Sequence, residues 1–442
     1  MPILCMGGMF SKVISRPAAC YDCGPEQHMP FITGLRCVFC GRMQGTRGTF
    51  TCRDCGITGI LDVEYDYPAI AKVLTRRTLA ARRELTHWRY RELLPIGANS
   101  KLPDVAVGWT PLTDAPALGR HIGVRKLYIK DDGRNASASL KDRASSVGVV
   151  KARETKRIII ACASTGNAAS SCAGMAASMG LESVIFVPER SPEPKVTQLL
   201  IFGATVLRVR GTYEQAFQLC QQACERWGWY NRNSGINPYL VEGKKTAGLE
   251  IGEQLVWEAP DWVAVSVGDG CTVAGVWKGL RELRTLGLMA RSPRILGVQA
   301  EGAAPVTACF RSGGMLEPVE PRTIADSIAV GVPRNWKKAV TAITESKGEM
   351  INVSDDEILD AMRYTGRLAG VFAEPAAATA VAGLRRAVSE GIVGRRSTAV
   401  ALVTGNGLKD VSSARAAAGE PFEVPPDGAG LEDILRERNV IE

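Results

Sequence analysis

The sequence predicts an α/β fold built on a doubly wound parallel sheet, and three observations lead to that prediction. The chain has 442 residues, of which 45% are hydrophobic and 23% charged, an ordinary globular composition with room for two or three domains. From about residue 126 onward, short β-branched or apolar runs alternate with helical stretches, which is typical of parallel sheets. Three of these runs end in glycine-containing turns, and parallel sheets bind ligands at the carboxyl ends of their strands.

The elements can be assigned in chain order. We expect strands at Lys126–Ile129, Arg157–Cys162, Ser183–Val187, Thr205–Val209, Trp262–Val267, Arg294–Val298 and Ala399–Val403. We expect the main helices at Asp142–Thr155, Asn167–Met179, Tyr213–Trp227, Thr272–Leu286 and Asp355–Leu368. A helix-like pattern also covers residues 68–94 and ends at Pro95.

Six arginines crowd between residues 76 and 91, and we predict that they form a solvated helix face. The alternative is a nucleic-acid contact. A net charge of +8 and a pI of about 8.8 are too mild to favour it.

The cysteines separate the first 55 residues from the rest of the chain, because seven of the 13 fall there. The N-terminus lacks a basic start followed by a long apolar core, so it does not resemble a signal peptide. No uninterrupted apolar stretch reaches the ~18 residues that a transmembrane helix needs. Many thiols in a chain without a secretion signal indicate a reducing compartment, so we expect a cytoplasmic protein.

Four of these cysteines have the spacing of a zinc ribbon, with two C-x-x-C pairs separated by 11 residues. The candidate zinc ligands are Cys37, Cys40, Cys52 and Cys55. Each pair places two thiolates on one tight turn, and two such turns close a tetrahedral site. A closed site of this kind is structural, so we expect no catalytic role for the metal. The alternative is a degenerate ribbon of reduced thiols.

A further pair, Cys20 and Cys23, lies close to His28 in the sequence. It fits a competing ligand pair, half of a second metal site or a redox pair, and the sequence does not choose among them.

The three glycine-containing turns are Ser164–Asn167, Gly268–Thr272 and Thr404–Gly407. A turn that opens a helix presents backbone N–H groups beside the positive end of the helix dipole, where phosphate and carboxylate groups bind. One such turn often serves tight packing alone, but three in one chain favour an anionic ligand. The turns match neither a dinucleotide-binding fingerprint nor a P-loop, so a dinucleotide enzyme or an NTPase is disfavoured.

Lys141 lies in the segment S-L-K-D-R at the start of a predicted helix. We expect Lys141 just before this helix and Asp142 in its first turn, where an acidic residue is favourable. A lysine placed there forms a Schiff base if burial lowers its pKa. A lysine in such a segment is more often exposed on the surface. The hypothesis that Lys141 forms a Schiff base therefore depends on the ligand-binding turns nearby.

Motifs along the chain resemble those of the threonine synthase family, a group of fold-type II pyridoxal-phosphate (PLP) enzymes. The resemblance covers about residues 35–412, and the number, order and spacing of the motifs are too extensive for chance. The matching segments are His87–Pro95, Gly108–Leu112, Ser139–Arg143, Ser164–Asn167, Glu242–Thr246, Gly297–Gly302, Phe372–Ala376 and Thr404–Asp410.

The resemblance implies two doubly wound parallel-sheet domains behind a zinc-ribbon-like segment at residues 1–66. The large PLP-binding domain would comprise residues 67–155 and 240–415, and the small domain residues 156–239. Residues 416–442 would form a C-terminal extension.

The resemblance also implies a role for each matching site residue. Lys141 matches the lysine that carries PLP and later moves the proton at the substrate α-carbon. The turn that holds the cofactor phosphate is matched by Gly268, Asp269, Gly270, Cys271 and Thr272. The turn that receives the substrate carboxylate is matched by Ser164, Thr165, Gly166 and Asn167.

Three further matches concern the cofactor ring. Asn167 matches a residue that also reaches the 3′ oxygen of PLP. Thr404 matches the hydroxyl that faces the pyridine nitrogen, and a neutral partner there suits elimination and replacement better than transamination. Glu374 is expected to shape the pocket without transferring a proton.

Two residues depart from the family pattern where the substrate phosphate binds. Leu240 stands in place of an arginine that usually grips this phosphate, and Ala168 in place of a threonine that helps to bind it. Losing a charge-assisted arginine contact costs about 1.5–3 kcal/mol. Lys244, where the family often has glutamine, is a candidate to compensate. Asp269 in the cofactor turn must point away from the phosphate or accept hydrogen bonds from the loop.

Three hypotheses of function follow. The first is a threonine synthase, which eliminates phosphate from O-phosphohomoserine and adds water at the β-carbon. The second is a relative that performs β-elimination or β-replacement on another serine- or threonine-like amino acid. The third is a zinc-ribbon nucleic-acid-binding protein with a pseudoenzyme domain. For the enzyme we expect PLP and structural zinc as cofactors, a small amino acid as substrate, a homodimer, and neither nucleic acid nor a membrane as partner.

Overall fold

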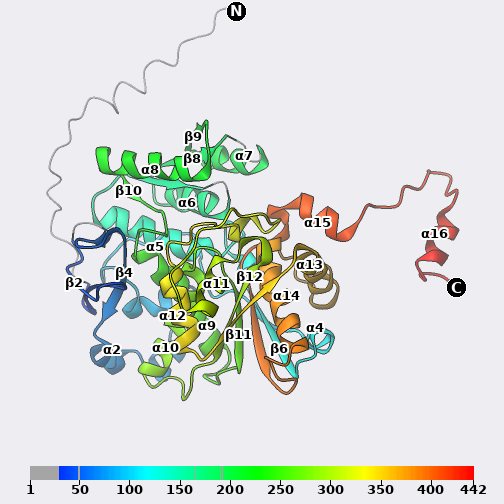
Figure 1. The fold of residues 1–442 in the computed structure, drawn as a ribbon, viewed down its shortest axis with the longest axis horizontal. Coiled ribbons are helices and arrows are strands. Elements are labelled where there is room, and N and C mark those ends of the chain that lie inside the picture. Colours follow the sequence, from blue (N-terminus) through cyan, green and yellow to red (C-terminus); the bar gives the residue numbers. More distant parts are fainter. Residues whose placement is uncertain (1–28, 48–49, 165, 190, 192) are drawn as a thin grey trace, which may run out of the picture.

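A computed structural model describes residues 29–47, 50–164, 166–189, 191 and 193–442 (Figure 1). In this part of the chain it contains a six-stranded sheet, a four-stranded parallel sheet and a four-stranded antiparallel sheet near the N-terminus. The predicted α/β fold with parallel sheets is confirmed. No helix of the described residues is long and apolar enough to cross a membrane.

The six-stranded sheet carries most of the candidate site. In spatial order its strands are β13 (Glu349–Val353), β12 (Arg294–Ala300), β11 (Trp262–Ser266), β14 (Thr398–Val403), β6 (Lys126–Asp131) and β5 (Leu112–Asp114). Adjacent strands are parallel, except that the edge strand β5 runs antiparallel to β6. Successive side chains face opposite sides: Ala264 and Ala401 join one hydrophobic cluster, and Val265 and Leu402 join another. Both faces are buried, which explains the nearly continuous apolar runs of these strands.

Helices cover both faces of this sheet. One face packs against α4 (Pro116–Ile122), α13 (Asp355–Ala369) and α14 (Pro375–Ser389). The other face packs against α9 (Tyr239–Gln254), α10 (Cys271–Thr285) and α12 (Trp336–Glu345). Two further helices pack on this second layer, α5 (Lys141–Glu154) on α9 and α11 (Pro305–Ser312) on α12. Single 3-10 turns join these elements at η2 (Asp132–Arg134), η3 (Glu301–Ala303), η4 (Asp326–Ile328) and η5 (Gly407–Lys409).

The parallel four-stranded sheet is a smaller copy of the same arrangement. Its strands in spatial order are β10 (Tyr230–Asn231), β7 (Ile159–Ala163), β8 (Glu182–Pro188) and β9 (Thr205–Val209). Its helices are α6 (Asn167–Ser178), α7 (Glu193–Ile201) and α8 (Tyr213–Trp227). Alternate side chains of β7 and β8 enter two different hydrophobic clusters, one of which contains the buried face of α8. Figure 1 shows this sheet and its helices above the six-stranded sheet.

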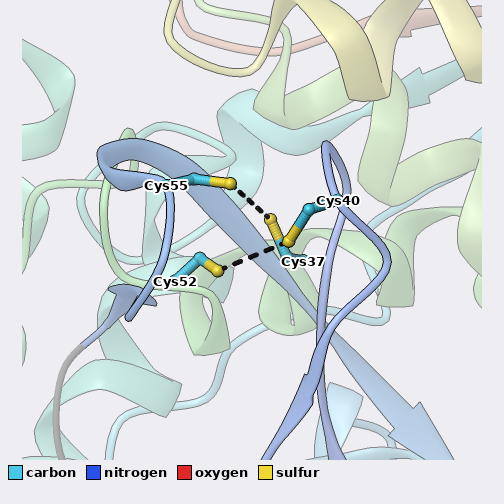
Figure 2. A group of neighbouring side chains, drawn as sticks. All are labelled: Cys37, Cys40, Cys52 and Cys55. Carbon is cyan, nitrogen blue, oxygen red and sulfur yellow. Dashed lines mark hydrogen bonds between the residues drawn. The ribbon is translucent and has the colours of Figure 1, made fainter.

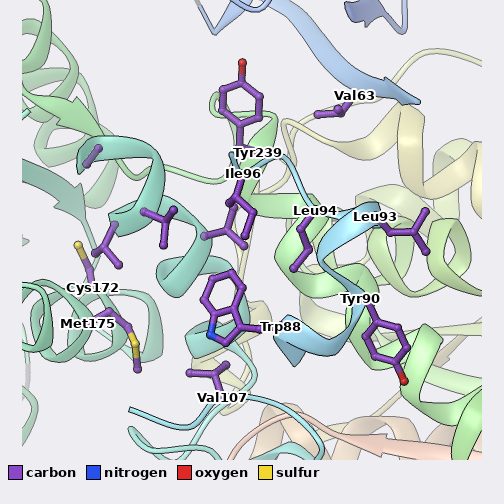
Figure 3. Close-up of a cluster of buried hydrophobic side chains, with 14 of the residues drawn as sticks. Val63, Trp88, Tyr90, Leu93, Leu94, Ile96, Val107, Cys172, Met175 and Tyr239 are labelled. Atoms are coloured by element: carbon purple, nitrogen blue, oxygen red, sulfur yellow. The ribbon is translucent and has the colours of Figure 1, made fainter. Parts of the chain in front are cut away.

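The antiparallel sheet contains the cysteine pairs. Its strands in spatial order are β2 (Met43–Gln44), β1 (Ile32–Cys37), β4 (Gly56–Tyr65) and β3 (Thr51–Cys52). It shares a core with the rest of the molecule, because Val63 of β4 lies in the same hydrophobic cluster as Trp88 and Tyr239 (Figure 3). Tyr65 Oη also donates a hydrogen bond of 2.8 Å to Glu242 Oε2 on α9.

The region predicted as helix-like, residues 68–94, differs from its prediction. It forms α2 (Tyr67–Val73), α3 (Arg76–Ala80) and the 3-10 helix η1 (His87–Leu93), so it is not one helix. The prediction of solvated arginines holds for four of the six, which are exposed: Arg76, Arg77, Arg83 and Arg91. They do not share one helix face, and Arg89 is buried and pairs with Glu253 at 2.6 Å. The apolar residues of η1 resembled one face of a helix in the sequence. They are apolar because η1 lies inside a hydrophobic core (Figure 3).

The C-terminal segment leaves the body of the molecule after α15 (Val411–Ala418) and ends in the short helix α16 (Leu431–Glu437) (Figure 1). α16 has no buried residues. The boundaries of the predicted domains and of this extension stay predictions.

Candidate active site and metal centre

A cavity of about 560 Å³ lies between the two parallel sheets, at the carboxyl ends of β7, β11 and β14. Most of the residues predicted from the sequence line it. They are Lys141, Ser164, Gly166, Asn167, Ala168, Lys244, Gly268, Asp269, Gly270, Cys271, Thr272 and Thr404. Thr165 lies outside the described residues. Leu240 does not line the cavity: it is fully buried on α9, in contact range of Gly148 on α5.

Lys141 is the first residue of α5, one position later than its predicted place before the helix. Burial and the positive charges of Lys244 and Arg232 together lower the pKa of its amine to about 8, against the opposing effect of Glu374. A substantial neutral fraction near physiological pH is what a lysine needs to attack a carbonyl group. The pKa shift therefore agrees with the predicted covalent role.

The turn Gly268–Thr272 joins β11 to the N-terminus of α10 and requires glycine at two positions. Gly270 has a φ of +94°, and a Cβ there would lie 2.6 Å from Asn335 O. A Cβ on Gly268 would lie 2.9 Å from Ile328 Cα. These close approaches leave the backbone N–H groups of the turn at the start of a 15-residue helix, the usual place for a phosphate.

Asp269 accepts hydrogen bonds from the neighbouring loop, as its place in the cofactor turn requires. Its Oδ1 accepts a hydrogen bond from the Arg334 backbone N–H at 2.8 Å, and its Oδ2 accepts one from Asn335 Nδ2 at 3.0 Å. The Cys271 thiol also donates to Oδ2, at 2.9 Å. The carboxylate is thus satisfied by the neighbouring loop. Cys271 is buried, and burial raises its thiol pKa to about 12, so a reactive thiolate is not favoured.

The turn after β7 is linked to the large sheet through Asn167. Its Nδ2 donates to Glu374 Oε1 at 2.7 Å and to Ser327 Oγ at 3.2 Å. Burial raises the pKa of the Glu374 carboxyl above its usual value. Glu374 does not line the cavity. Glu374 instead holds the side-chain amide of the cavity residue Asn167 in place. This contact agrees with a role in shaping the pocket.

Thr404, at the end of β14, lies next to the start of α5. Its backbone O accepts a 2.8 Å hydrogen bond from the Leu140 backbone N–H, and Ser139 and Gly405 form an isolated antiparallel bridge. The end of β14 therefore fixes the backbone immediately before Lys141.

A buried ionic network behind α5 was not anticipated from the sequence. Arg143 donates to both carboxylate oxygens of Asp132, at 2.7 and 2.8 Å, and also to Glu250 on α9. Glu250 Oε2 accepts a further hydrogen bond of 2.6 Å from Lys130 on β6. All four side chains are fully buried. The network joins α5, α9 and β6 directly behind Lys141. In the sequence it is indicated only by charged residues inside otherwise apolar elements.

Two other cavity residues were also missed. Arg232 follows β10 and is 1% exposed, and Ser266 ends β11. Ser266 Oγ is buried and has no hydrogen-bond partner among the described residues. A buried hydroxyl without a partner is costly, so Ser266 Oγ points to a polar ligand in this cavity.

The residues of the cavity fit PLP. They supply a lysine of lowered pKa, a glycine turn at a helix N-terminus for a phosphate, the Thr404 hydroxyl and an unpartnered buried hydroxyl. These are the groups that a phosphorylated aldehyde with a polar ring requires.

The four predicted zinc ligands lie together, with their sulfur atoms within 4.8 Å of one another (Figure 2). Cys40 Sγ lies 3.7 Å from Cys52 Sγ, and Cys37 Sγ lies 3.9 Å from Cys55 Sγ. The backbone N–H of Cys55 lowers the pKa of the Cys52 thiol to about 7. This donor set fits a tetrahedral zinc site. Cys20, Cys23 and His28 lie outside the described residues.

The knuckle turns of this cluster use glycine for its conformation. Gly41 and Gly56 follow the two pairs with φ values of +74° and +62°, in the left-handed region. A Cβ on Gly59 would lie 2.6 Å from Cβ of both Cys52 and Cys55. The close approach of the pairs therefore depends on glycine at this third position.

Comparisons with known proteins agree with this geometry. Residues 104–405 match the family model described as pyridoxal-phosphate-dependent enzyme. The chain is 36% identical to threonine synthase of Methanocaldococcus jannaschii over 405 residues, which cover 91% of this chain and 99% of that protein. It is 39% identical to threonine synthase of Methanosarcina acetivorans over 380 residues, 85% of this chain and 92% of that protein.

Among solved structures, threonine deaminase isoform 2 of Solanum lycopersicum superposes with a TM-score of 0.61. At 24% identity it covers 70% of this chain and 88% of its own, and it shows the fold alone. The cavity, its lysine and the agreement over most of the chain lead to one conclusion. The chain belongs to the threonine synthase family of pyridoxal-phosphate-dependent enzymes.

Proposed function

We propose that this enzyme is a threonine synthase, which converts O-phosphohomoserine and water into threonine and inorganic phosphate. The single observation that carries this proposal is Lys141, a lysine of lowered pKa that faces a phosphate-binding turn in one cavity. Identities of 36% and 39% to proteins named threonine synthase support the choice of substrate.

The residues of the cavity divide the work of this reaction. When bound, PLP acts as an electron sink that stabilises negative charge at the α-carbon and, through it, at neighbouring carbons. With PLP bound, Lys141 Nζ would move the protons at the substrate carbons, and a pKa near the operating pH suits that task. The turn Ser164–Asn167 would bind the substrate carboxylate at the N-terminus of α6, where the backbone N–H of Asn167 is available. The backbone N–H groups of Gly268–Thr272 would bind the cofactor phosphate.

A second candidate is elimination or replacement at the β-carbon of another serine- or threonine-like amino acid. Two observations favour it: Leu240 lies outside the cavity, and Ala168 lines it where a hydroxyl would help to bind phosphate. The substrate phosphate would then have lost two of the contacts usual in the family.

Phosphate release distinguishes the two candidates. We expect the purified holoenzyme to release phosphate from O-phosphohomoserine and to form an equal amount of threonine, measured by a phosphate assay and amino-acid analysis. Phosphate release at the background rate, together with turnover of a serine- or threonine-like amino acid, would favour the second candidate. Ala168→Thr should then raise phosphate release above the background rate, because it returns to the cavity wall the hydroxyl that is usual in the family.

We also propose that Cys37, Cys40, Cys52 and Cys55 bind one structural zinc ion. Cys52→Ser should reduce the zinc content, measured by atomic absorption, from about one ion per chain to near zero. It should also lower the melting temperature, because loss of the metal unfolds the small sheet that shares a core with the body.

Cys309→Ser is the matched control for this variant, since Cys309 is a buried cysteine far from the cluster in sequence and outside it in space. An equally low zinc content in the wild type, Cys52→Ser and Cys309→Ser would contradict the metal site. The homodimer and the cytoplasmic location stay predictions from the sequence.

A further inference from the structure

Arg232 is a buried arginine without a matching negative charge. Its Nε donates to Ser145 Oγ at 3.0 Å and its Nη1 to Ser234 Oγ at 3.2 Å. Among the described residues, no carboxylate forms an ion pair with it, whereas Arg143 and Arg89 each pair with glutamate. Arg232 is 1% exposed, and its partners among the described residues are neutral: two hydroxyls, the Lys141 carbonyl and the Cys162 thiol. Its positive charge is therefore uncompensated. Such a charge is costly to bury, so this position favours an anionic ligand.

The surroundings of Arg232 strengthen this preference. Lys141 and Lys244 line the same cavity, and Arg232 contributes to the lowered pKa of both. Asp269, the acid in the adjoining turn, has its carboxylate engaged by the loop at Arg334 and Asn335. The inner wall of the cavity is therefore positive, which attracts and holds anions.

Gly148 on α5 shows where Arg232 lies relative to Leu240. A Cβ on Gly148 would lie 3.0 Å from Leu240 Cδ2 and 3.9 Å from Arg232 Cγ. Both side chains thus pack against the same point of α5. Arg232 lines the cavity, whereas Leu240 does not. The charge that is absent at Leu240 is present on the side chain beside it.

Lys244 serves a different part of the cavity. A Cβ on Gly275, in α10, would lie 3.1 Å from Lys244 Cβ, and the Cys271 and Asp269 side chains both act on the Lys244 amine. Lys244 therefore lies beside the first turn of α10, where the cofactor phosphate binds. Arg232 instead contacts the start of α5 and Ser234.

We propose that Arg232 binds the phosphate group of the substrate and thereby selects a phosphorylated leaving group. This inference rests on the proposed activity with O-phosphohomoserine, and it extends that activity by naming the residue that recognises the leaving group. It also explains how a chain with Leu240 and Ala168 retains an anion site.

The test compares holoenzymes carrying Arg232→Gln, Arg232→Lys and Arg208→Gln. Arg208 is the matched control, because it lies in the same sheet but is exposed and pairs with Glu193. In Arg232→Gln we expect KM for O-phosphohomoserine to rise about 10- to 100-fold, the loss of one charge-assisted contact. Arg232→Lys should retain part of the affinity because it keeps the charge, and Arg208→Gln should leave KM unchanged.

Binding of inorganic phosphate, measured by calorimetry on the same holoenzymes, separates this inference from the proposed function. We expect its Kd to rise by a similar factor in Arg232→Gln, while the cofactor absorbance and PLP affinity stay as in the wild type. An unchanged phosphate Kd, or a loss of PLP affinity with unchanged KM and phosphate Kd, would overturn the role of Arg232. If the wild type converts no O-phosphohomoserine yet loses phosphate binding in Arg232→Gln, the proposed function fails and the anion site stands.

Discussion

Lys141→Ala should lower kcat by about 10³-fold or more, because one residue provides both the covalent link to the cofactor and the proton transfers. Positioned proton transfer alone contributes about 10²- to 10⁴-fold. The wild-type holoenzyme should show a visible absorbance band that disappears on treatment with borohydride, since reduction fixes the cofactor to the lysine. The variant should lack this band while retaining the fold by circular dichroism.

The matched control is Lys72→Ala, which removes an exposed lysine of α2 and should leave both kcat and the absorbance band unchanged. The lowered pKa gives a second measurement. Below pH 8 the rate at which the cofactor-free protein captures PLP should increase with pH, and it should level off above this value, because only the neutral amine reacts. Borohydride-fixed PLP in Lys141→Ala equal to that of the wild type would show that another lysine carries the cofactor.

Glu250→Gln should have the largest effect on stability, because it breaks the buried network behind Lys141. The variant leaves Arg143 and Lys130 with a neutral amide in place of a carboxylate that both contact. Removing one partner of a buried ion pair costs about 3–5 kcal/mol. We expect this loss in the free energy of unfolding from urea titrations, and a lower kcat, because Arg143 lies two residues beyond Lys141 on α5.

Glu432→Gln is the control for this variant, since Glu432 pairs with Arg436 on α16 with side chains 69% and 55% exposed, and such pairs are worth about 0–1 kcal/mol. Arg143 and Lys130 hold the pKa of Glu250 well below its usual value. Glu250 therefore stabilises the fold above the carboxyl pKa of the unfolded chain, about 4.3, and this contribution is lost as the pH falls further. A wild type and a Glu250→Gln variant of equal stability at pH 7 would refute the structural role of the network.

The parts of the fold that the sequence predicted are those with a strong local signal. The strands after residue 126 are buried on both faces, so they appear as apolar runs, and the helix from Asn167 and the helix from Tyr213 begin where predicted. The helix-like prediction for residues 68–94 was wrong, because Trp88 and Tyr90 lie in a core rather than along one face of a long helix. Periodicity cannot separate these two causes.

The residues of the candidate site also fall into two groups, those that the sequence predicted and those that only the structure identified. Lys141, the glycine turns and the four cysteines depend on short motifs, and a motif is visible in one stretch of sequence. The roles of Arg232 and Ser266 follow only from what the folded chain places around them. Within the part of the chain that the structure describes, Arg232 has no carboxylate partner and Ser266 Oγ has no hydrogen-bond partner. The pairing of Arg143 with Glu250 joins residues 107 positions apart, a distance at which the sequence carries no signal.

The docking of the antiparallel sheet has a consequence for the order in which the chain folds during synthesis. The cysteine pairs leave the ribosome early and can close around a metal locally, but their partners come much later: Glu242 follows Tyr65 by 177 residues, and Lys338 follows Asp62 by 276. At about 5–20 residues per second, the preformed ribbon waits roughly 15 s to a minute for its docking surface. Scarcity of zinc should therefore reduce the yield of folded enzyme from translation far more than the turnover of molecules already assembled.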